Sequence, residues 1–169
     1  MDHPATQRDK RKRLERLGIA AGQVHFVEAD FTRDPVAGRL LQAGLDAEGP
    51  SLFLLEGVAV YLEPAVLETV LSQFRQVASA ASRLAISVSL SGARGEARSR
   101  FRDSVAALGE PARSSFKADE AEELLARTGW LVVRADPGDP HDSEAAARRE
   151  RLRSAGLLTA RVGPASPSH

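Results

Sequence analysis

Short apolar runs alternate with amphipathic segments along almost the whole chain, and this alternation constrains the fold more than any other feature. Each run is short enough for a β-strand and is rich in Val, Leu, Ile or Phe, whereas the segments between the runs carry apolar residues at helical spacing. Strands that alternate with helices indicate an α/β fold, in which helices pack against a central sheet. The predicted strands cover residues 24–29, 51–55, 84–90, 130–135 and 157–162.

Proline and glycine mark the ends of the predicted helices. Pro64 suits the first position of a helix, where its missing N–H costs nothing, and Gly18 and Gly129 suit the residues that follow two helices. The continuous apolar run at 51–55 predicts a strand buried on both faces. We predict one partial domain over residues 1–163 and a disordered tail at 164–169. The predicted helices cover residues 5–17, 35–45, 64–77, 118–128, an Arg-rich surface helix or lid at 92–108, and 144–154 after a loop at 136–143.

The composition excludes several kinds of site and partner. The chain has no Cys, so it has no disulfides, thiolate metal sites or cysteine nucleophiles, and its four His show no metal-ligand spacing. Lys and Arg total 23, as do Asp and Glu, so zero net charge gives no electrostatic reason to expect a nucleic acid or membrane partner. The basic run between Arg8 and Arg16 is then the solvated face of a helix. No apolar run approaches the roughly 20 residues of a membrane span, and no secretory signal is present, so we expect a cytoplasmic protein without a metal.

Three acidic residues stand at positions where α/β sheets bind ligands. Asp2 precedes the first helix, Asp30 follows the run at 24–29, and Glu56 follows the run at 51–55. Ligands of parallel sheets bind outside the carboxyl ends of the strands. There a carboxylate can accept hydrogen bonds from ribose hydroxyls or from an adenine amine, and the ring of Phe31 can lie beside a base. Each acidic residue alone is more often a helix cap or a solvated side chain, and the three together indicate a nucleotide-like ligand.

Four motifs in order make the chain similar to a known family. They are MDHPATQRDKRKR at the N-terminus, HFVEADFTRD at 25–34, LFLLEGVAVYLEP at 52–64, and GEPARSSF followed by LLARTGW at 109–130. Together they resemble bacterial S-adenosylmethionine-dependent methyltransferases related to leucine carboxyl methyltransferases. The resemblance covers nearly the whole chain, and the first and third motifs are specific. It implies a class I methyltransferase fold with a Rossmann-like sheet, a final antiparallel strand, and a small-molecule methyl acceptor.

The resemblance also implies a role for individual residues. Asp2 matches the position that binds the ribose of S-adenosylmethionine, and Asp30 and Phe31 match the pair at the adenine. Glu56 matches the carboxylate near the methionine end, with Gly57 and Tyr61 in the same wall. No residue matches a general base, and the resemblance leaves the methyl acceptor and the oligomeric state open.

The chain departs from the family at its N-terminus. Such enzymes carry a glycine-rich turn about 20 residues before the ribose-binding acid, whereas here the acid is residue 2 and no G-x-G-x-x-G occurs. The expectation is a fold truncated at the N-terminus, which lacks the first strand and most of the second. Unpaired strand edges would then reduce stability, and residues 1–169 alone would bind the cofactor weakly or not at all.

Two other functions are compatible with parts of the sequence. Ser87, Ser89 and Ser91 could suggest a hydrolase, but there is no G-x-S-x-G elbow. The chain could also be a non-catalytic remnant that acts only as a binding or interaction module. The motifs favour the other interpretation, an S-adenosylmethionine-dependent O- or carboxyl-methyltransferase of a small molecule that is present here as an incomplete fragment.

Overall fold

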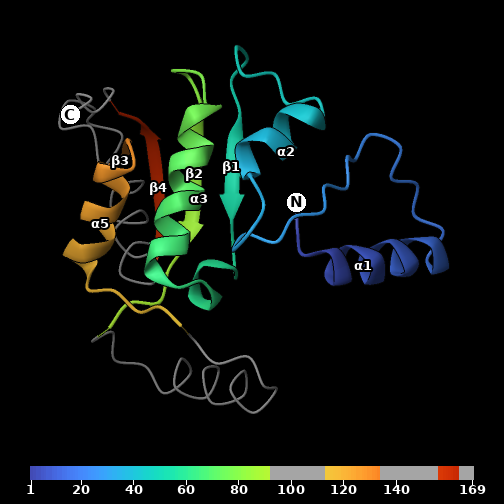
Figure 1. Ribbon diagram of the computed structural model, residues 1–169, viewed down its shortest axis with the longest axis horizontal. Helices are drawn as coiled ribbons and strands as arrows, with labels where there is room; N and C mark the ends of the chain where they lie inside the picture. The colour runs from blue at the N-terminus through green and yellow to red at the C-terminus, as the bar shows by residue number, and fades with distance from the viewer. Residues whose placement is uncertain (92–112, 134–155, 164–169) are drawn as a thin grey trace, which may run out of the picture.

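A computed structural model describes residues 1–91, 113–133 and 156–163 of the chain (Figure 1). The predicted helices at 92–108 and 144–154, the loop at 136–143 and the tail at 164–169 lie outside these residues. Within them the chain contains both helices and strands, which confirms the predicted α/β class. None of the described helices combines the length and the apolar character that a membrane span requires.

Four strands form one mixed sheet in the order β1-β2-β4-β3. Strands β1 (Leu52–Leu55) and β2 (Arg83–Ser87) are parallel, with Leu52 opposite Arg83 and Leu55 opposite Ile86. Strand β4 (Leu157–Val162) runs antiparallel to both β2 and β3 (Trp130–Val132). The predicted final antiparallel strand is therefore confirmed, with the predicted bounds.

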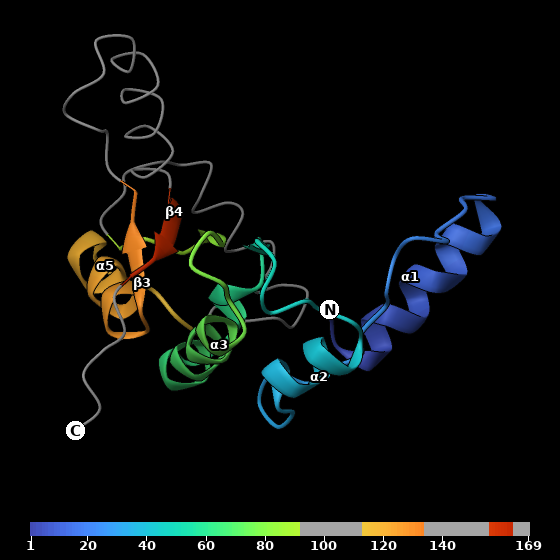
Figure 2. The ribbon, with the colours of Figure 1, turned by 90° about the horizontal axis from the view of Figure 1, so that it is seen from above.

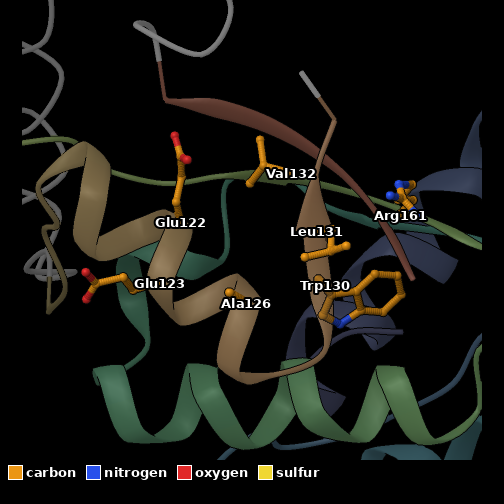
Figure 3. A pocket seen from close by; sticks show the side chains of 7 residues that line it. All are labelled: Glu122, Glu123, Ala126, Trp130, Leu131, Val132 and Arg161. Atoms are coloured by element: carbon orange, nitrogen blue, oxygen red, sulfur yellow. The ribbon is translucent and has the colours of Figure 1, made fainter. Parts of the chain in front are cut away.

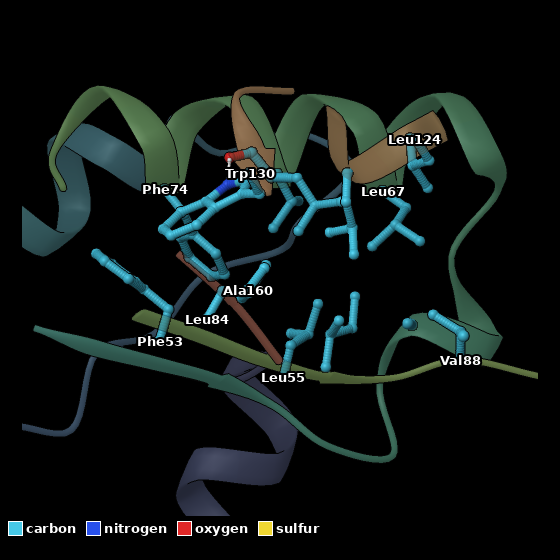
Figure 4. Packing of buried hydrophobic residues seen from close by; sticks show 14 of the residues in the cluster. Phe53, Leu55, Leu67, Phe74, Leu84, Val88, Leu124, Trp130 and Ala160 are labelled. Carbon is cyan, nitrogen blue, oxygen red and sulfur yellow. Dashed lines mark hydrogen bonds between the residues drawn. The ribbon is translucent and has the colours of Figure 1, made fainter. Parts of the chain in front are cut away.

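Two helices cover one face of this sheet (Figure 2). Helix α3 (Pro64–Gln76) begins with proline as predicted, and α5 (Ala118–Arg127) is followed by Gly129 at φ +82°. Their apolar stripes meet the inward-facing residues of the strands in one core (Figure 4). At its centre lies Trp130, which is 0% exposed, contacts the Phe53 ring edge-on and donates a hydrogen bond from Nε1 to the Leu71 carbonyl at 3.1 Å.

The opposite face of β1 is not covered, and this corrects one prediction. Phe53 and Leu55 are buried, but Leu52 and Leu54 are 68% and 60% exposed. The strand therefore alternates between faces and is not buried on both. The physical reason is that the described helices α3 and α5 pack against one face only, so every second side chain of β1 meets solvent.

The N-terminal region lies on the side of β1 away from β2 (Figures 1 and 2). Helix α1 (Pro4–Arg16) projects from the sheet and buries only Gln7, while α2 (Val36–Gln42) lies against α3. Gln73 of α3 caps α2, because its Oε1 accepts the Ala37 N–H at 3.1 Å.

The strand predicted at 24–29 is wrong in the described structure. Only an isolated parallel bridge forms there, between Glu28 and Asp2, with bonds from Asp2 N–H to the Val27 carbonyl and from Ala29 N–H to the Asp2 carbonyl. A β-strand needs a neighbouring strand that accepts hydrogen bonds from its N–H groups and donates hydrogen bonds to its carbonyl groups. Among the described residues only Asp2 offers its backbone to this run as a strand would, so the ladder ends after one pair.

Candidate functional site

Asp2 is one of the two residues of the parallel bridge, and only His3 separates it from the start of α1. One carboxylate oxygen accepts the His3 N–H at 2.9 Å, and the other lies 3.3 Å from Lys10 Nζ. The side chain keeps 30% of its surface exposed. A carboxylate offers about four lone-pair sites, so these two contacts leave room for hydroxyl donors of a ligand.

Asp30 comes one residue after Ala29, which is bonded to Asp2. Its Oδ1 accepts hydrogen bonds from the Thr32 hydroxyl at 2.6 Å and from the Thr32 N–H at 2.9 Å. These two bonds hold the pKa of Asp30 below its ordinary value, and the nearby Arg33 and His3 lower the pKa further. Asp30 is therefore an ionised acceptor at neutral pH. Phe31 beside it is half-buried and packs against the edge of the core.

Glu56, Gly57 and Tyr61 belong to the turn that follows β1. Glu56 is exposed, Gly57 has a φ of +67° that favours glycine, and Tyr61 ends the short 3-10 helix η1 (Ala59–Tyr61). The Gly57 N–H donates to the Ser87 hydroxyl at 2.8 Å. This turn therefore presents a carboxylate directly beyond the carboxyl end of a parallel strand.

The predicted site residues form two groups. In the first group, Asp2 is paired with Glu28, and Asp30 and Phe31 follow Glu28 by two and three residues. In the second group, the turn after β1 contains Glu56, Gly57 and Tyr61. Among residues 1–91, 113–133 and 156–163, no strand joins the bridge to the outer edge of β1. Their assignment to the cofactor stays a prediction.

The sequence interpretation considered Ser87 only as a nucleophile and missed its contact with Gly57. The sequence does contain a hint of this contact, because Ser87 lies at the end of one predicted strand and Gly57 lies in the turn after another. Only the β1–β2 register shows that these two ends are adjacent.

An open hollow of about 380 Å³ lies elsewhere, beside α5 and β3 (Figure 3). Glu122 and Glu123 stand at one end of it, Arg161 lies at the other, and Leu131 lies between. Because β3 and β1 are opposite edges of the sheet, this hollow is separate from the turn that carries Glu56. In the part of the chain that the structure describes, no group of three or more acidic or His residues is arranged to hold a metal ion.

Comparisons with known proteins agree with the resemblance. Residues 1–75 match the leucine carboxyl methyltransferase family. The chain is 29% identical over 159 residues to YktD of Bacillus subtilis, named a "Putative S-adenosyl-L-methionine-dependent methyltransferase", covering 90% of this chain and 52% of YktD. A protein of the same description from Saccharopolyspora erythraea is 30% identical over 144 residues, covering 82% of this chain and 50% of that protein. The chain thus spans about half the length of these relatives.

Solved structures show the same fold. Human N-acetylserotonin methyltransferase in complex with S-adenosylmethionine superposes with a TM-score of 0.58 at 15% sequence identity, over 96% of this chain and 39% of that one. This likeness establishes the class I arrangement for the described α/β unit. In sequence this chain is therefore similar to bacterial proteins described as putative S-adenosyl-L-methionine-dependent methyltransferases, and over residues 1–75 it is similar to the leucine carboxyl methyltransferase family.

Proposed function

We propose that this chain forms part of the S-adenosylmethionine site of an enzyme that transfers a methyl group to an oxygen or carboxylate of a small molecule. The observation that carries the proposal is the placement of acidic residues at the parallel bridge and beyond the end of β1. Asp2 forms the bridge with Glu28, Asp30 follows two residues after Glu28, and Glu56 lies directly beyond β1. The family of the chain supports the identity of the ligand.

The charge and exposure of these groups fit the proposed cofactor. Asp2 would accept hydrogen bonds from the ribose hydroxyls, and the ionised Asp30 would accept one from the adenine amine. The half-buried Phe31 ring would lie beside the base, and Glu56 would face the cationic methionine end. Gly57 and Tyr61 would complete that wall.

When bound, the cofactor supplies the electrophilic methyl group. The residues of the chain bind and orient it, and they exclude water from the reacting atoms. No described side chain is proposed as a general base, so the acceptor would lose its proton to a group outside this set.

We further propose that residues 1–169 alone bind the cofactor weakly and do not turn over. The sequence has no glycine-rich turn of the G-x-G-x-x-G type, and the outer edge of β1 has no strand partner among the described residues. The dissociation constant for the cofactor should therefore be about 1 mM. This is much weaker than a complete site would give.

A titration of the ¹⁵N-labelled chain with S-adenosylhomocysteine, followed by NMR to millimolar concentrations, tests both statements. We expect saturable shifts at the amides of residues 2, 30 and 56, and a reduced response in Asp30→Asn. Asp46→Asn is the matched control, because Asp46 also accepts a local backbone N–H, from Glu48 at 3.0 Å, but lies outside the proposed site. Unresponsive site amides contradict the proposed function, and micromolar affinity contradicts the weak binding.

The uncovered face of β1 favours a second candidate, a non-catalytic binding module. Leu52 and Leu54 are two exposed apolar residues on β1, which has no strand partner at one edge among the described residues. Such surfaces tend to be covered by another polypeptide. The coding frame ahead of Met1 distinguishes the candidates. An in-frame glycine-rich strand and turn favours the enzyme, and an unrelated sequence favours the module.

A further inference from the structure

The turn that carries Glu56 is held by a hydroxyl on the neighbouring strand. Strand β1 ends at Leu55, and two residues later the Gly57 N–H donates to Ser87 Oγ at 2.8 Å. Ser87 is the last residue of β2, one position beyond the pair that joins Leu55 and Ile86. The hydroxyl therefore supplies an acceptor at the point where the parallel ladder between the two strands ends.

A second hydroxyl holds the other end of the same turn. Ser114 is 4% exposed and donates from Oγ to the Ala59 carbonyl at 2.9 Å. The neighbouring Val60 carbonyl accepts the N–H groups of Arg113 at 2.8 Å and Ser114 at 3.2 Å. Three hydrogen bonds thus join the segment around Ser114 to η1.

Both attachments of the turn connect it to β2 and the residues that directly follow β2. The segment that carries Ser114 continues to Phe116, which bonds to the extension of β2 through the Ser89 carbonyl at 2.9 Å and the Ser91 N–H at 2.7 Å. The turn is therefore located with respect to β2 at its start through Ser87 and at its end through Ser114.

Glu56 depends on this backbone for its position. Within the described residues its carboxylate makes no side-chain hydrogen bond or ion pair, and the residue is exposed. No side-chain contact anchors it, so the conformation of the turn decides where the carboxylate lies.

We propose that Ser87 and Ser114 are positioning residues that hold the Glu56 carboxylate where it meets the amino-acid end of the ligand. The inference rests on the proposed function, since it concerns the same site. Removing either hydroxyl should reduce recognition of the amino-acid end and leave recognition of the nucleoside end unchanged.

Two ligands distinguish recognition of the amino-acid end from recognition of the nucleoside end. S-adenosylhomocysteine carries an ammonium and a carboxylate, whereas 5′-methylthioadenosine has the same nucleoside and thioether without the amino-acid chain. In NMR titrations of the full chain, Ser87→Ala and Ser114→Ala should each lower the affinity for S-adenosylhomocysteine about five- to tenfold, which is the effect of one lost hydrogen bond. They should change the response to 5′-methylthioadenosine by less than about twofold. Ser87→Thr keeps the hydroxyl and should restore the wild-type preference.

Ser82→Ala is the matched control. Ser82 is buried, and its Oγ accepts the Ser51 N–H at 3.1 Å, so it makes the same kind of contact between the same two strands at their opposite ends. If losing a buried serine hydroxyl simply destabilises the sheet, Ser82→Ala and Ser87→Ala should show the same loss of stability. A loss of affinity confined to S-adenosylhomocysteine should appear only in the variants at Ser87 and Ser114.

The outcomes distinguish this inference from the proposed function. A wild-type chain that responds to neither ligand overturns the proposed function and the inference with it. A wild-type chain that binds both ligands overturns the inference alone if Ser87→Ala weakens them equally, or if Ser82→Ala is as selective. Hydrogen exchange at Leu84 and Ile86 confirms in each variant that the sheet is folded.

Discussion

The sheet with its two helices and the N-terminal region are stabilised very differently, although both come from the same chain. In the sheet unit, α3 and α5 bury a continuous core around Trp130. In the N-terminal region, α1 buries only Gln7, and Leu17 and Ile19 after it are 70% and 52% exposed. Hydrophobic burial is the main favourable term in folding, so the sheet unit should fold cooperatively, whereas α1 and the residues directly after it should open locally. The difference teaches that a good helix pattern does not provide a partner for the helix.

The largest expected effect is on the core. Trp130→Ala removes a fully buried ring and its hydrogen bond to Leu71, so it should lower the free energy of unfolding by about 3–5 kcal/mol. Leu17→Ala in the N-terminal region should change it by less than about 0.5 kcal/mol, because Leu17 is mostly exposed. Urea denaturation followed by circular dichroism measures both. Equal losses would show that the two regions form one cooperative unit.

A smaller and local effect is expected at Gln7. Its Nε2 donates to the Val27 carbonyl at 3.0 Å, and the side chain is 2% exposed, so it joins α1 to the segment beside Asp2. Gln7→Ala should destabilise this attachment by about 1–2 kcal/mol. Hydrogen exchange should become faster at the amides of Asp2 and Ala29 and stay unchanged at Leu84. Faster exchange at Leu84 as well would show that the attachment of α1 and the sheet are energetically coupled, against this prediction.

The smallest effect concerns pH and the turn at Asp30. Hydrogen bonds from Thr32 lower the pKa of Asp30 in the folded state. The stabilisation is therefore present above the ordinary aspartate pKa of about 3.9 and is lost as the pH falls from there through the folded pKa. The turn should loosen in acid below about pH 4, and Thr32→Val should move the pKa of Asp30 back up. An NMR titration of the carboxyl carbon measures the pKa.

Thr69→Val is the control for this change, since the Thr69 hydroxyl bonds to the Ala65 carbonyl on the exposed side of α3 and contacts no carboxylate. A pKa of Asp30 that moves equally in both variants would mean that the Thr32 hydroxyl is not the cause.

Local signals in the sequence predicted the α-helices and most of the strands that lie in the described residues. Pro64 begins α3, Gly129 follows α5, and the apolar stripe of α3 is buried as expected. These features succeed because capping, proline geometry and side-chain periodicity act over a few residues. The motifs likewise indicated the similarity to S-adenosylmethionine-dependent methyltransferases, which the sequence comparisons also find, without any knowledge of the fold.

What the sequence by itself determined is the α/β class, the similarity to S-adenosylmethionine-dependent methyltransferases and the position of Glu56 at the end of β1. Only the tertiary structure decided which strands find partners and which faces are covered. The run at 24–29 forms a single bridge, the outward leucines of β1 meet solvent, and Ser87 becomes the acceptor for Gly57. The physical reason is that a strand and a buried face are defined by their neighbours. Those neighbours come from distant parts of the chain, so no local pattern can specify them.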